Sequence, residues 1–217
     1  MTYPQPPWTL RGYALQTLQL IDIARVRPLI PSELEIIAVW PGKTIGGVFV
    51  ASYGAGSALE YNELIVVSAI TRHASQPGGW ISHIYVDNPD SVAGGREIWG
   101  LPKELAQFTW GQGDQRCVRV HQGDQLLCSL SYGWQLPGWR PPLAIPSFST
   151  LGSNLLFFEA QSKTQLHLVN AELQVPRESP FSKLGFNQTL VSFYCDQLHL
   201  VVGAPKVVGI ASAYSSS

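Results

Sequence analysis

Residues 94–106 read GGREIWGLPKELA, and this run decides how the rest of the chain is interpreted. Three glycines and a proline surround Lys103, whose near neighbours in sequence include Ile98, Trp99, Leu101 and Leu105. Apolar surroundings disfavour an ammonium ion and therefore lower the pKa of a lysine. A neutral lysine is a nucleophile that forms Schiff bases with carbonyl compounds. The alternative is a turn after a helix, with Lys103 pointing into water.

The same run resembles the active-site segment of the acetoacetate decarboxylase family. In that family a helix ends in Gly-Arg-Glu and a Pro-Lys pair soon follows, as in residues 95–97 and 102–103 here. The resemblance implies that Lys103 is the Schiff-base lysine. Acetoacetate decarboxylase is itself the standard example of a lysine activated by its surroundings, so this mechanism is what the resemblance implies. Family decarboxylases carry a second lysine next, where this chain has Glu104, and an ionised carboxylate there would raise the pKa of Lys103.

The resemblance also assigns roles to residues outside this run. Arg11, in an Arg-x-Tyr that opens the first predicted strand, would hold the substrate carboxylate or tune the site, and Glu60 would transfer protons. Glu63 is the second candidate for the glutamate of that region. Small-molecule pockets are mostly apolar and aromatic. The predicted substrate-binding residues are therefore the aromatic Phe49, Tyr53, Trp80 and Trp99, and Glu63 and Glu104 are predicted to join them.

Composition limits the function further. The chain has 217 residues, a formal charge of −1 and only 13% charged residues, which does not favour nucleic acid or an anionic membrane as a partner. Three widely spaced cysteines predict reduced thiols in a cytoplasmic protein. The N-terminus does not resemble a signal peptide, and no apolar run is long enough for a membrane helix. The five histidines lack metal-ligand spacing, so neither a metal nor a cofactor is expected.

Short β-rich segments separated by turn signals predict a mainly β protein with antiparallel strands. Strong helix signals occur only twice: Asp22 before residues 23–26, and Asn88-Pro89-Asp90 before a helix that ends between residues 94 and 99. The proline-rich residues 137–146 are predicted to be a linker or loop. The resemblance implies that residues 1–217 form one domain, a β-barrel with a cone-like cavity. Strands are expected at residues 10–20, 39–53, 58–67, 80–86, 105–110, 116–121, 126–134, 165–173, 189–195 and 207–213.

The predicted function is Schiff-base chemistry on a small β-keto or α-keto acid. The iminium accepts electrons, so decarboxylation and aldol or dehydration chemistry are both open. Residues 46–51, 63–64 and 100–102 also resemble the plant neoxanthin-deficiency proteins of the same superfamily. That resemblance implies the alternative, in which an apolar cavity binds an isoprenoid or carotenoid and Lys103 is incidental. The family builds large homo-oligomers, so a homo-oligomer is expected.

Overall fold

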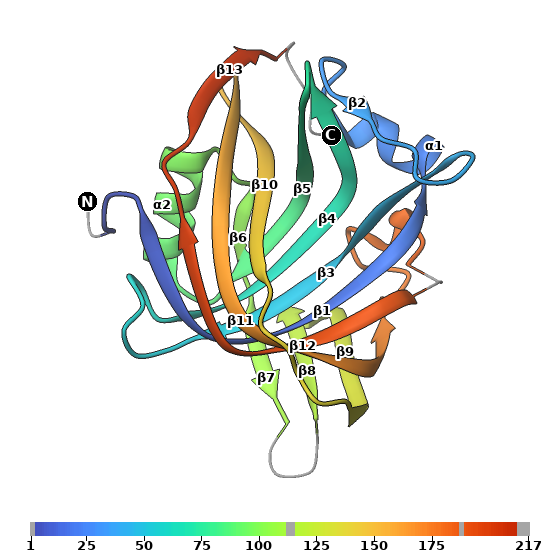
Figure 1. The fold of residues 1–217 in the computed structure, drawn as a ribbon, viewed down its shortest axis with the longest axis vertical. Helices are drawn as coiled ribbons and strands as arrows, with labels where there is room; N and C mark the ends of the chain where they lie inside the picture. The colour runs from blue at the N-terminus through green and yellow to red at the C-terminus, as the bar shows by residue number, and fades with distance from the viewer. Residues whose placement is uncertain (1–2, 112–115, 187–188, 212–217) are drawn as a thin grey trace.

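The computed structural model describes residues 3–111, 116–186 and 189–211, and strands dominate this part of the chain (Figure 1). The predicted mainly β fold is confirmed. The helical segments are α1 (Ile23–Val26), η1 (Arg27–Leu29), α2 (Pro89–Trp99) and η2 (Ser182–Leu184). The strands are β1 (Trp8–Asp22), β2 (Glu35–Ile36), β3 (Lys43–Tyr53), β4 (Tyr61–His73), β5 (Gln76–Val86), β6 (Lys103–Leu105), β7 (Gln107–Trp110), β8 (Cys117–Gln122), β9 (Gln125–Gln135), β10 (Pro142–Leu151), β11 (Asn154–Gln174), β12 (Thr189–Val202) and β13 (Lys206–Ile210).

Strand pairing closes the sheet into a ring. The order runs β10-β5-β4-β3-β1-β12-β11-β9-β8-β7, and β10 pairs with β11 as well as with β5. The path from β10 through β5, β4, β3, β1 and β12 to β11 therefore returns to β10. Neighbours are antiparallel except for the parallel pairs β10–β5 and β5–β6. Side chains along each strand alternate between the inside and the outside of this ring.

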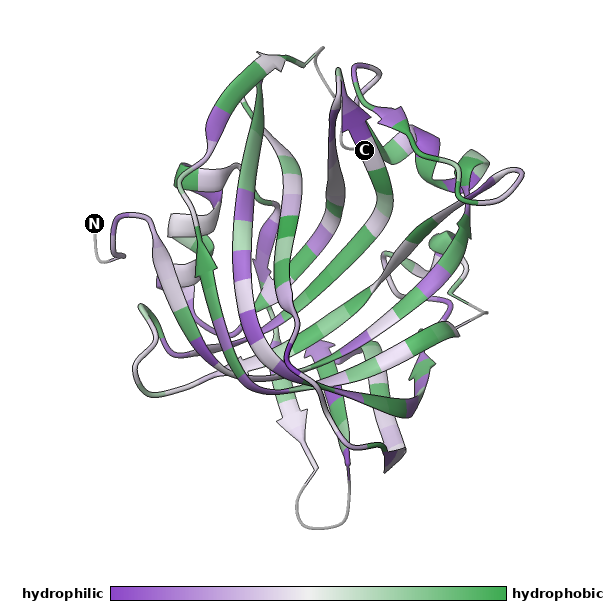
Figure 2. Ribbon diagram, in the orientation of Figure 1, coloured by the Kyte–Doolittle hydropathy of each residue, from purple (hydrophilic) through white to green (hydrophobic). Residues whose placement is uncertain are grey.

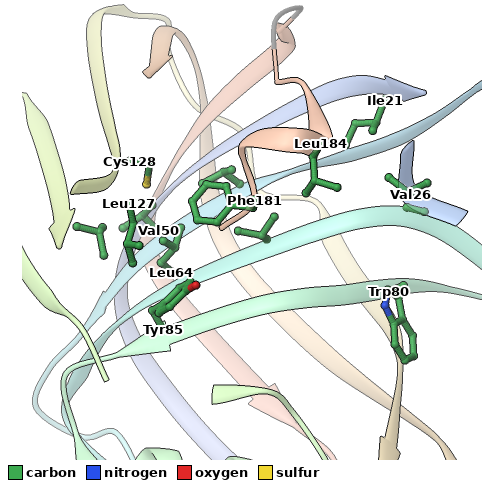
Figure 3. Close-up of a cluster of buried hydrophobic side chains, with 14 of the residues drawn as sticks. Ile21, Val26, Val50, Leu64, Trp80, Tyr85, Leu127, Cys128, Phe181 and Leu184 are labelled. Carbon is green, nitrogen blue, oxygen red and sulfur yellow. The ribbon is translucent and has the colours of Figure 1, made fainter. Parts of the chain in front are cut away.

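Both surfaces of the ring are buried in its central part. On β3, Phe49 belongs to an inner cluster whereas Val48 and Val50 belong to an outer core. The outer core is covered by β8, β9 and the segment around η2, which contributes Phe181 and Leu184 (Figure 3). Hydrophobic residues follow much of the length of the strands, and the tip of β4 is hydrophilic (Figure 2). Burial on two faces explains the uninterrupted apolar run at residues 48–51, since a half-buried strand would alternate.

Residues 137–146 differ from the prediction, because β10 begins at Pro142 and is not part of a linker. Pro142 and Pro146 lie opposite Lys163 and Glu159 of β11. Proline cannot donate a backbone hydrogen bond, so it is tolerated where one edge of a strand is unpaired. β10 pairs with β5 at Ser147 and Phe148, so the backbone edge beside both prolines is not paired with β5.

Both predicted helices are present. Asp22 precedes α1 but makes no capping hydrogen bond through its side chain. The Asn88 side chain accepts hydrogen bonds from the backbone N–H groups of Asp90 (2.9 Å) and Ser91 (3.3 Å), and Gly100, the residue after the end of α2, has a φ of 61°. A left-handed residue at this position favours glycine.

The predicted strand at 207–213 is β13, which ends at Ile210, and residues 212 and 213 lie outside the described part. Within the described ranges, no helix is long and apolar enough to cross a membrane.

Candidate active site

Lys103 is the first residue of β6 and lies inside the ring, with 3% of its surface exposed. It pairs with Ile84 of β5, and the short strand follows directly on the turn after α2. Two contacts hold it against the helix. A Cβ at Gly95 would lie 2.4 Å from Lys103 Cδ, so only glycine leaves room for the lysine there. Arg96 Nε donates to the Lys103 carbonyl oxygen at 2.7 Å.

The Lys103 ammonium has a buried carboxylate partner. Nζ donates to Glu63 Oε1 at 2.8 Å and to Ser91 Oγ at 3.0 Å. The side chains of Lys103 and Glu63 are only 4% and 5% exposed. Nζ also lies 5.0 Å from the centre of the Tyr61 ring and 5.8 Å from that of Trp8, within the range of cation–π attraction. A charge removed from water needs such compensation, because burial without a partner is costly.

Two tyrosines complete the environment of Glu63. Tyr53 donates its hydroxyl proton to Glu63 Oε2 at 3.1 Å. Burial, and then the charge of Glu63, raises the pKa of both Tyr53 and Tyr61 well above the ordinary value of 10.0. Both phenols therefore stay protonated at neutral pH. Glu63 accepts hydrogen bonds from Lys103 and Tyr53 at its two oxygens, so its orientation is fixed on both sides.

A cavity of about 430 Å³ extends from this ion pair along the inside of the ring. Lys103 and Glu63 are the charged residues of its lining within the described part of the chain. Its most exposed lining residues are Ala144 and Ile145 of β10, which indicates where it opens. The other polar side chains of the lining are Gln16, Tyr61, Ser147, Ser162 and Thr164. The remaining surface is apolar or aromatic, with Trp8, Phe49, Ile65, Trp99 and Phe193 among its members.

Some of the residues predicted from sequence meet at this cavity. Lys103, Glu63, Phe49 and Trp99 line it. Tyr53 lies just behind the lining and reaches the site through its hydrogen bond to Glu63. The structure thus brings together the lysine, the second-choice glutamate and three of the four predicted aromatic residues.

The other predicted residues lie elsewhere. Glu60 is exposed just before β4, and Arg11 is exposed on the outer face of β1. Glu104 points away from the cavity, because it follows Lys103 on the strand, and it accepts a hydrogen bond from Gln122 Nε2 at 2.8 Å. Trp80 belongs to the outer core (Figure 3), and it is opposite Phe148 in the pairing of β5 with β10. None of these four lines the cavity.

Three contacts of the lysine were missed in the sequence: Ser91, Tyr61 and Trp8. The signal for Tyr61 and Glu63 was present, since both alternate with Ile65 in a period of two and must share its inward face. Ser91 lies four residues before Gly95, on the same side of α2, and could have been placed by helical spacing. Trp8 precedes the first predicted strand by two residues and gave no comparable signal.

The cavity has no feature of a metal centre. In the residues that the structure describes, no group of histidine, cysteine, aspartate and glutamate side chains is arranged to hold a metal ion. Cys195 lines the cavity, and burial raises the pKa of its thiol to about 12. A thiol with that pKa is protonated at neutral pH and is a poor nucleophile. The amine of Lys103 is therefore the better nucleophile in the cavity once it loses its proton.

A sequence model of the family described as Acetoacetate decarboxylase (ADC) matches residues 2–178. The chain belongs to the acetoacetate decarboxylase family. Solved structures agree in fold: acetoacetate decarboxylase from Legionella pneumophila gives a TM-score of 0.79 with 18% identity, over 97% of this chain and 90% of that one. The enduracididine biosynthesis enzyme MppR complexed with pyruvate gives a TM-score of 0.73 with 13% identity, over 96% and 92%.

Two groups of curated relatives can be aligned with about half of this chain. Protein NEOXANTHIN-DEFICIENT 1 of Oryza sativa is 33% identical over 109 residues, which is 50% of this chain and 36% of the relative. Acetoacetate decarboxylase of Burkholderia mallei is 33% identical over 115 residues, 52% of this chain and 40% of the relative. The chain thus spans well under two thirds of the length of these relatives. Both resemblances found in the sequence are confirmed.

Proposed function

We propose that this protein is a lyase in which Lys103 forms a Schiff base with the ketone of a keto acid. The observation that carries the proposal is the enclosed pair of Lys103 Nζ and Glu63 Oε1, 2.8 Å apart at one end of an apolar cavity. Amine nucleophiles need a way to become neutral, and an adjacent base supplies one. Membership in the acetoacetate decarboxylase family supports the same reaction class.

The pair can release the amine without sending a proton into water. Moving one proton from Lys103 Nζ to Glu63 Oε1 converts ammonium and carboxylate into amine and carboxylic acid. A low-dielectric site penalises the charged form of each group, so it lowers the cost of this transfer relative to water. Tyr53 stays bonded to the second oxygen of Glu63 throughout, and Ser91 can accept the remaining N–H of the amine.

Schiff-base formation then preserves the charge of the site. The amine of Lys103 attacks the ketone carbon, and Glu63 returns its proton to the former carbonyl oxygen. A second proton passes from the attacking nitrogen to the same oxygen through Glu63, and that oxygen leaves as water. The product is an iminium ion, which carries the positive charge that the ammonium carried and faces the same carboxylate. The Glu63 carboxylate, held by Tyr53, is therefore positioned to stabilise the iminium as it stabilised the ammonium.

Decarboxylation follows from the iminium as an electron acceptor. The bond between the α-carbon and the carboxylate breaks, CO₂ leaves, and the electron pair forms an enamine with the nitrogen of Lys103. A proton drawn from solvent, with Glu63 as the nearest carrier, converts the enamine to a new iminium. Water then releases the ketone and restores the ammonium. Aldol or dehydration chemistry would begin from the same iminium and use the same two residues.

The substrate carboxylate would be held without an arginine. Arg11 lies outside the cavity, and the described lining contains no cation besides Lys103. The polar groups available to a carboxylate are the hydroxyls and amide of Ser147, Ser162, Thr164 and Gln16. A carboxylate held by neutral donors in apolar surroundings is less stabilised than one paired with a guanidinium. This arrangement favours loss of the carboxylate as CO₂.

Reductive trapping tests the proposal. The protein is incubated with acetoacetate or pyruvate, treated with borohydride and digested for mass spectrometry. We expect an adduct at Lys103, its absence in Lys103→Met, and its retention in Lys206→Met, the control on the exposed strand β13. An adduct spread over many lysines, or none with either keto acid, would contradict the proposal. Measurement of CO₂ release from acetoacetate would separate decarboxylation from the other outcomes.

One observation favours the alternative of an apolar ligand. At about 30 Å³ for each water-sized atom, a cavity of about 430 Å³ holds roughly 14 such atoms, about twice the number in acetoacetate. Its surface away from Lys103 is mainly hydrophobic. An isoprenoid or carotenoid segment would fit this surface without reacting. Protein purified from a carotenoid-producing host would then be coloured, and borohydride would trap no keto acid.

Two further expectations belong to this proposal. A homo-oligomer, as the family resemblance implies, would give a mass above 23.8 kDa by light scattering at micromolar concentration. The widely spaced thiols, two of which are buried, fit a cytoplasmic protein.

A further inference from the structure

A second pocket lies on the outer face of the cavity wall and is basic. Its volume is about 480 Å³. We call it the basic pocket and define it by the residues that line it: Arg11, Arg140, Pro141, Pro142, Lys163, Thr164, Gln165, Gln197 and His199. Neighbours of these residues in sequence, such as Leu198 and Leu200, line the cavity instead. The two pockets therefore lie on opposite faces of strands β1, β11 and β12, and Thr164 lines both.

The strand register brings the cationic side chains into one row. Arg11 of β1 is opposite His199 of β12, and His199 is opposite Lys163 of β11. Directly opposed side chains in antiparallel strands have Cβ atoms only about 5 Å apart, and like charges in such positions are destabilising. Arg11 and Lys163 thus flank the imidazole ring of His199. An anion bound between these basic side chains would offset their mutual repulsion.

Carboxylates of the protein do not complete it. In residues 3–111, 116–186 and 189–211, ion pairs join Asp22 to Arg25 and Lys43, Glu35 to Arg72, and Glu63 to Lys103. Arg11, Arg140 and Lys163 have no such partner within the same ranges. The acid nearest to the pocket along β12 is Asp196, whose Oδ1 accepts the backbone N–H of Gln197 at 2.9 Å. The chain as a whole has a formal charge of −1, so this excess of positive charge is local.

The pocket is also held in a defined shape. Arg140 donates to Gln197 Oε1 at 2.6 Å and to Gln165 Oε1 at 3.4 Å, which fixes the guanidinium at one edge. Gln197 has a φ of 49°, a conformation that is uncommon for residues other than glycine. The pairing of β12 with β1 shifts between Gly12 and Ala14, and its pairing with β11 shifts between Lys163 and Gln165; in both places β12 has one extra residue, at the level of Gln197. Bulges and unusual backbone angles of this kind gather at functional sites.

We propose that the basic pocket binds a phosphoryl group. Guanidinium groups match phosphate oxygens in geometry and charge, and lysine adds a further point charge. The convergence of Arg11, Arg140 and Lys163 suits an anion with more than one charge. Such a group occurs on soluble phosphorylated molecules and on the headgroups of anionic lipids. The pocket lies on the other face of the wall from the Lys103 cavity and shares only Thr164 with it, so this inference does not depend on the reaction proposed there.

Calorimetric titration of the full chain with inorganic phosphate and with pyrophosphate at constant ionic strength tests the site. We expect binding, tighter for pyrophosphate, and a loss of at least tenfold in affinity for Lys163→Glu and for Arg140→Gln. Lys206→Glu is the matched control, because it makes the same charge change as Lys163→Glu on the exposed strand β13. Its affinity should stay within about twofold of the original protein. Circular dichroism checks that each variant is folded.

Vesicle sedimentation distinguishes the two sources of the phosphoryl group. Binding to phosphatidylglycerol vesicles but not to phosphatidylcholine vesicles, lost in Lys163→Glu, supports the pocket with a lipid headgroup as its ligand. Binding of pyrophosphate without vesicle binding supports the pocket with a soluble ligand. The inference is overturned if neither anion nor anionic vesicles bind, or if Lys206→Glu weakens binding as much as Lys163→Glu does.

Discussion

Lys103 and Lys163 lie on opposite faces of the same closed sheet, and their surroundings differ in nearly every respect. Lys103 is 3% exposed and is bonded to Glu63. Lys163 is exposed, aligned with His199, and has no carboxylate partner in the described part of the chain. A buried ammonium needs a partner from its own protein, because desolvation is costly. An exposed one is hydrated, so its partner can come from outside.

The difference teaches which lysine can change its charge. At the inner site a proton can move between two groups that are 2.8 Å apart and shielded from water. At the outer site the amine is exposed beside other basic side chains, and no carboxylate in the described ranges is paired with it. The inner face is therefore suited to chemistry and the outer face to electrostatic attraction.

Removal of the inner pair should give the largest effect. Lys103→Met alone leaves Glu63 buried without its cation, and Glu63→Leu alone strands the ammonium. Each change should destabilise the fold by about 3–5 kcal/mol, whereas the double variant should be close to neutral. On the outer face, Lys163→Met should change stability by no more than about 0.5 kcal/mol. Urea unfolding of the four variants measures the free energies. Single costs that simply add in the double variant would contradict the coupling.

An intermediate effect is expected where α2 meets Lys103. In an open helix, glycine to alanine stabilises by about 1 kcal/mol. Gly95→Ala should instead destabilise by about 1–3 kcal/mol, because the new Cβ would lie 2.4 Å from Lys103 Cδ. Displacement of the lysine should also slow borohydride trapping at least tenfold. Gly54→Ala is the control, since nothing lies within 4 Å of a Cβ there. Equal trapping rates for both variants would show that the contact does not position the lysine.

The smallest effect is expected at Glu104, on the outer face of the strand that carries Lys103. Because Glu104 faces away, Glu104→Lys should leave the dependence of Lys103 trapping on pH unchanged. Its effect should appear at His83, where burial lowers the pKa from the ordinary value of 6.5 and the charge of Glu104 opposes that shift. With a lysine at position 104 the pKa of His83 should fall further.

The sign of the resulting pH dependence follows from linkage. Folding keeps His83 neutral, so its contribution to stability is full above pH 6.5 and is lost as the pH falls towards the lowered pKa. Glu104→Lys should therefore lose more stability than the original protein when the pH is lowered from 7.5 to about 5.5. Histidine NMR titration and urea unfolding at the two pH values measure this. A displaced trapping profile for Lys103 would show that Glu104 acts on the cavity after all.

The sequence located Lys103 and its helix better than it located the side chains that contact the lysine. Lys103 and the helix before it were recognisable from a local run of residues. The choice of Glu60 over Glu63 followed family spacing, although the period-two pattern of β4 would have put Glu63 on the inward face. Arg11 was assigned to the site by resemblance, yet the structure places it on the outer face, because its neighbour Leu10 faces the cavity and side chains alternate along β1.

The extent of the strands was also beyond local reasoning. β10 contains two prolines and was predicted to be a loop, because its stability comes from β11, which follows it, and from the unpaired edge on its other side. The closure of the ring depends on the contact of Ser147 and Phe148 with β5, more than 60 residues earlier in the chain. Pairing between such distant segments depends on tertiary structure and is not determined by the local β-propensity of the residues.

Helix α2 contains adjacent glycines, and this has a consequence for how the site can be observed. Gly94 and Gly95 each weaken a helix by about 1 kcal/mol relative to alanine, and their places are filled by the Trp8 ring and the Lys103 side chain. The packing of Trp8 and Lys103 against these glycines therefore stabilises the helix, and the helix in turn positions the two side chains. Its backbone amides should exchange with deuterium through local opening, at a rate set by whatever occupies Lys103. The rate of deuterium exchange in α2 should therefore report whether a ligand is bound at Lys103, even when the ligand is colourless and is not turned over.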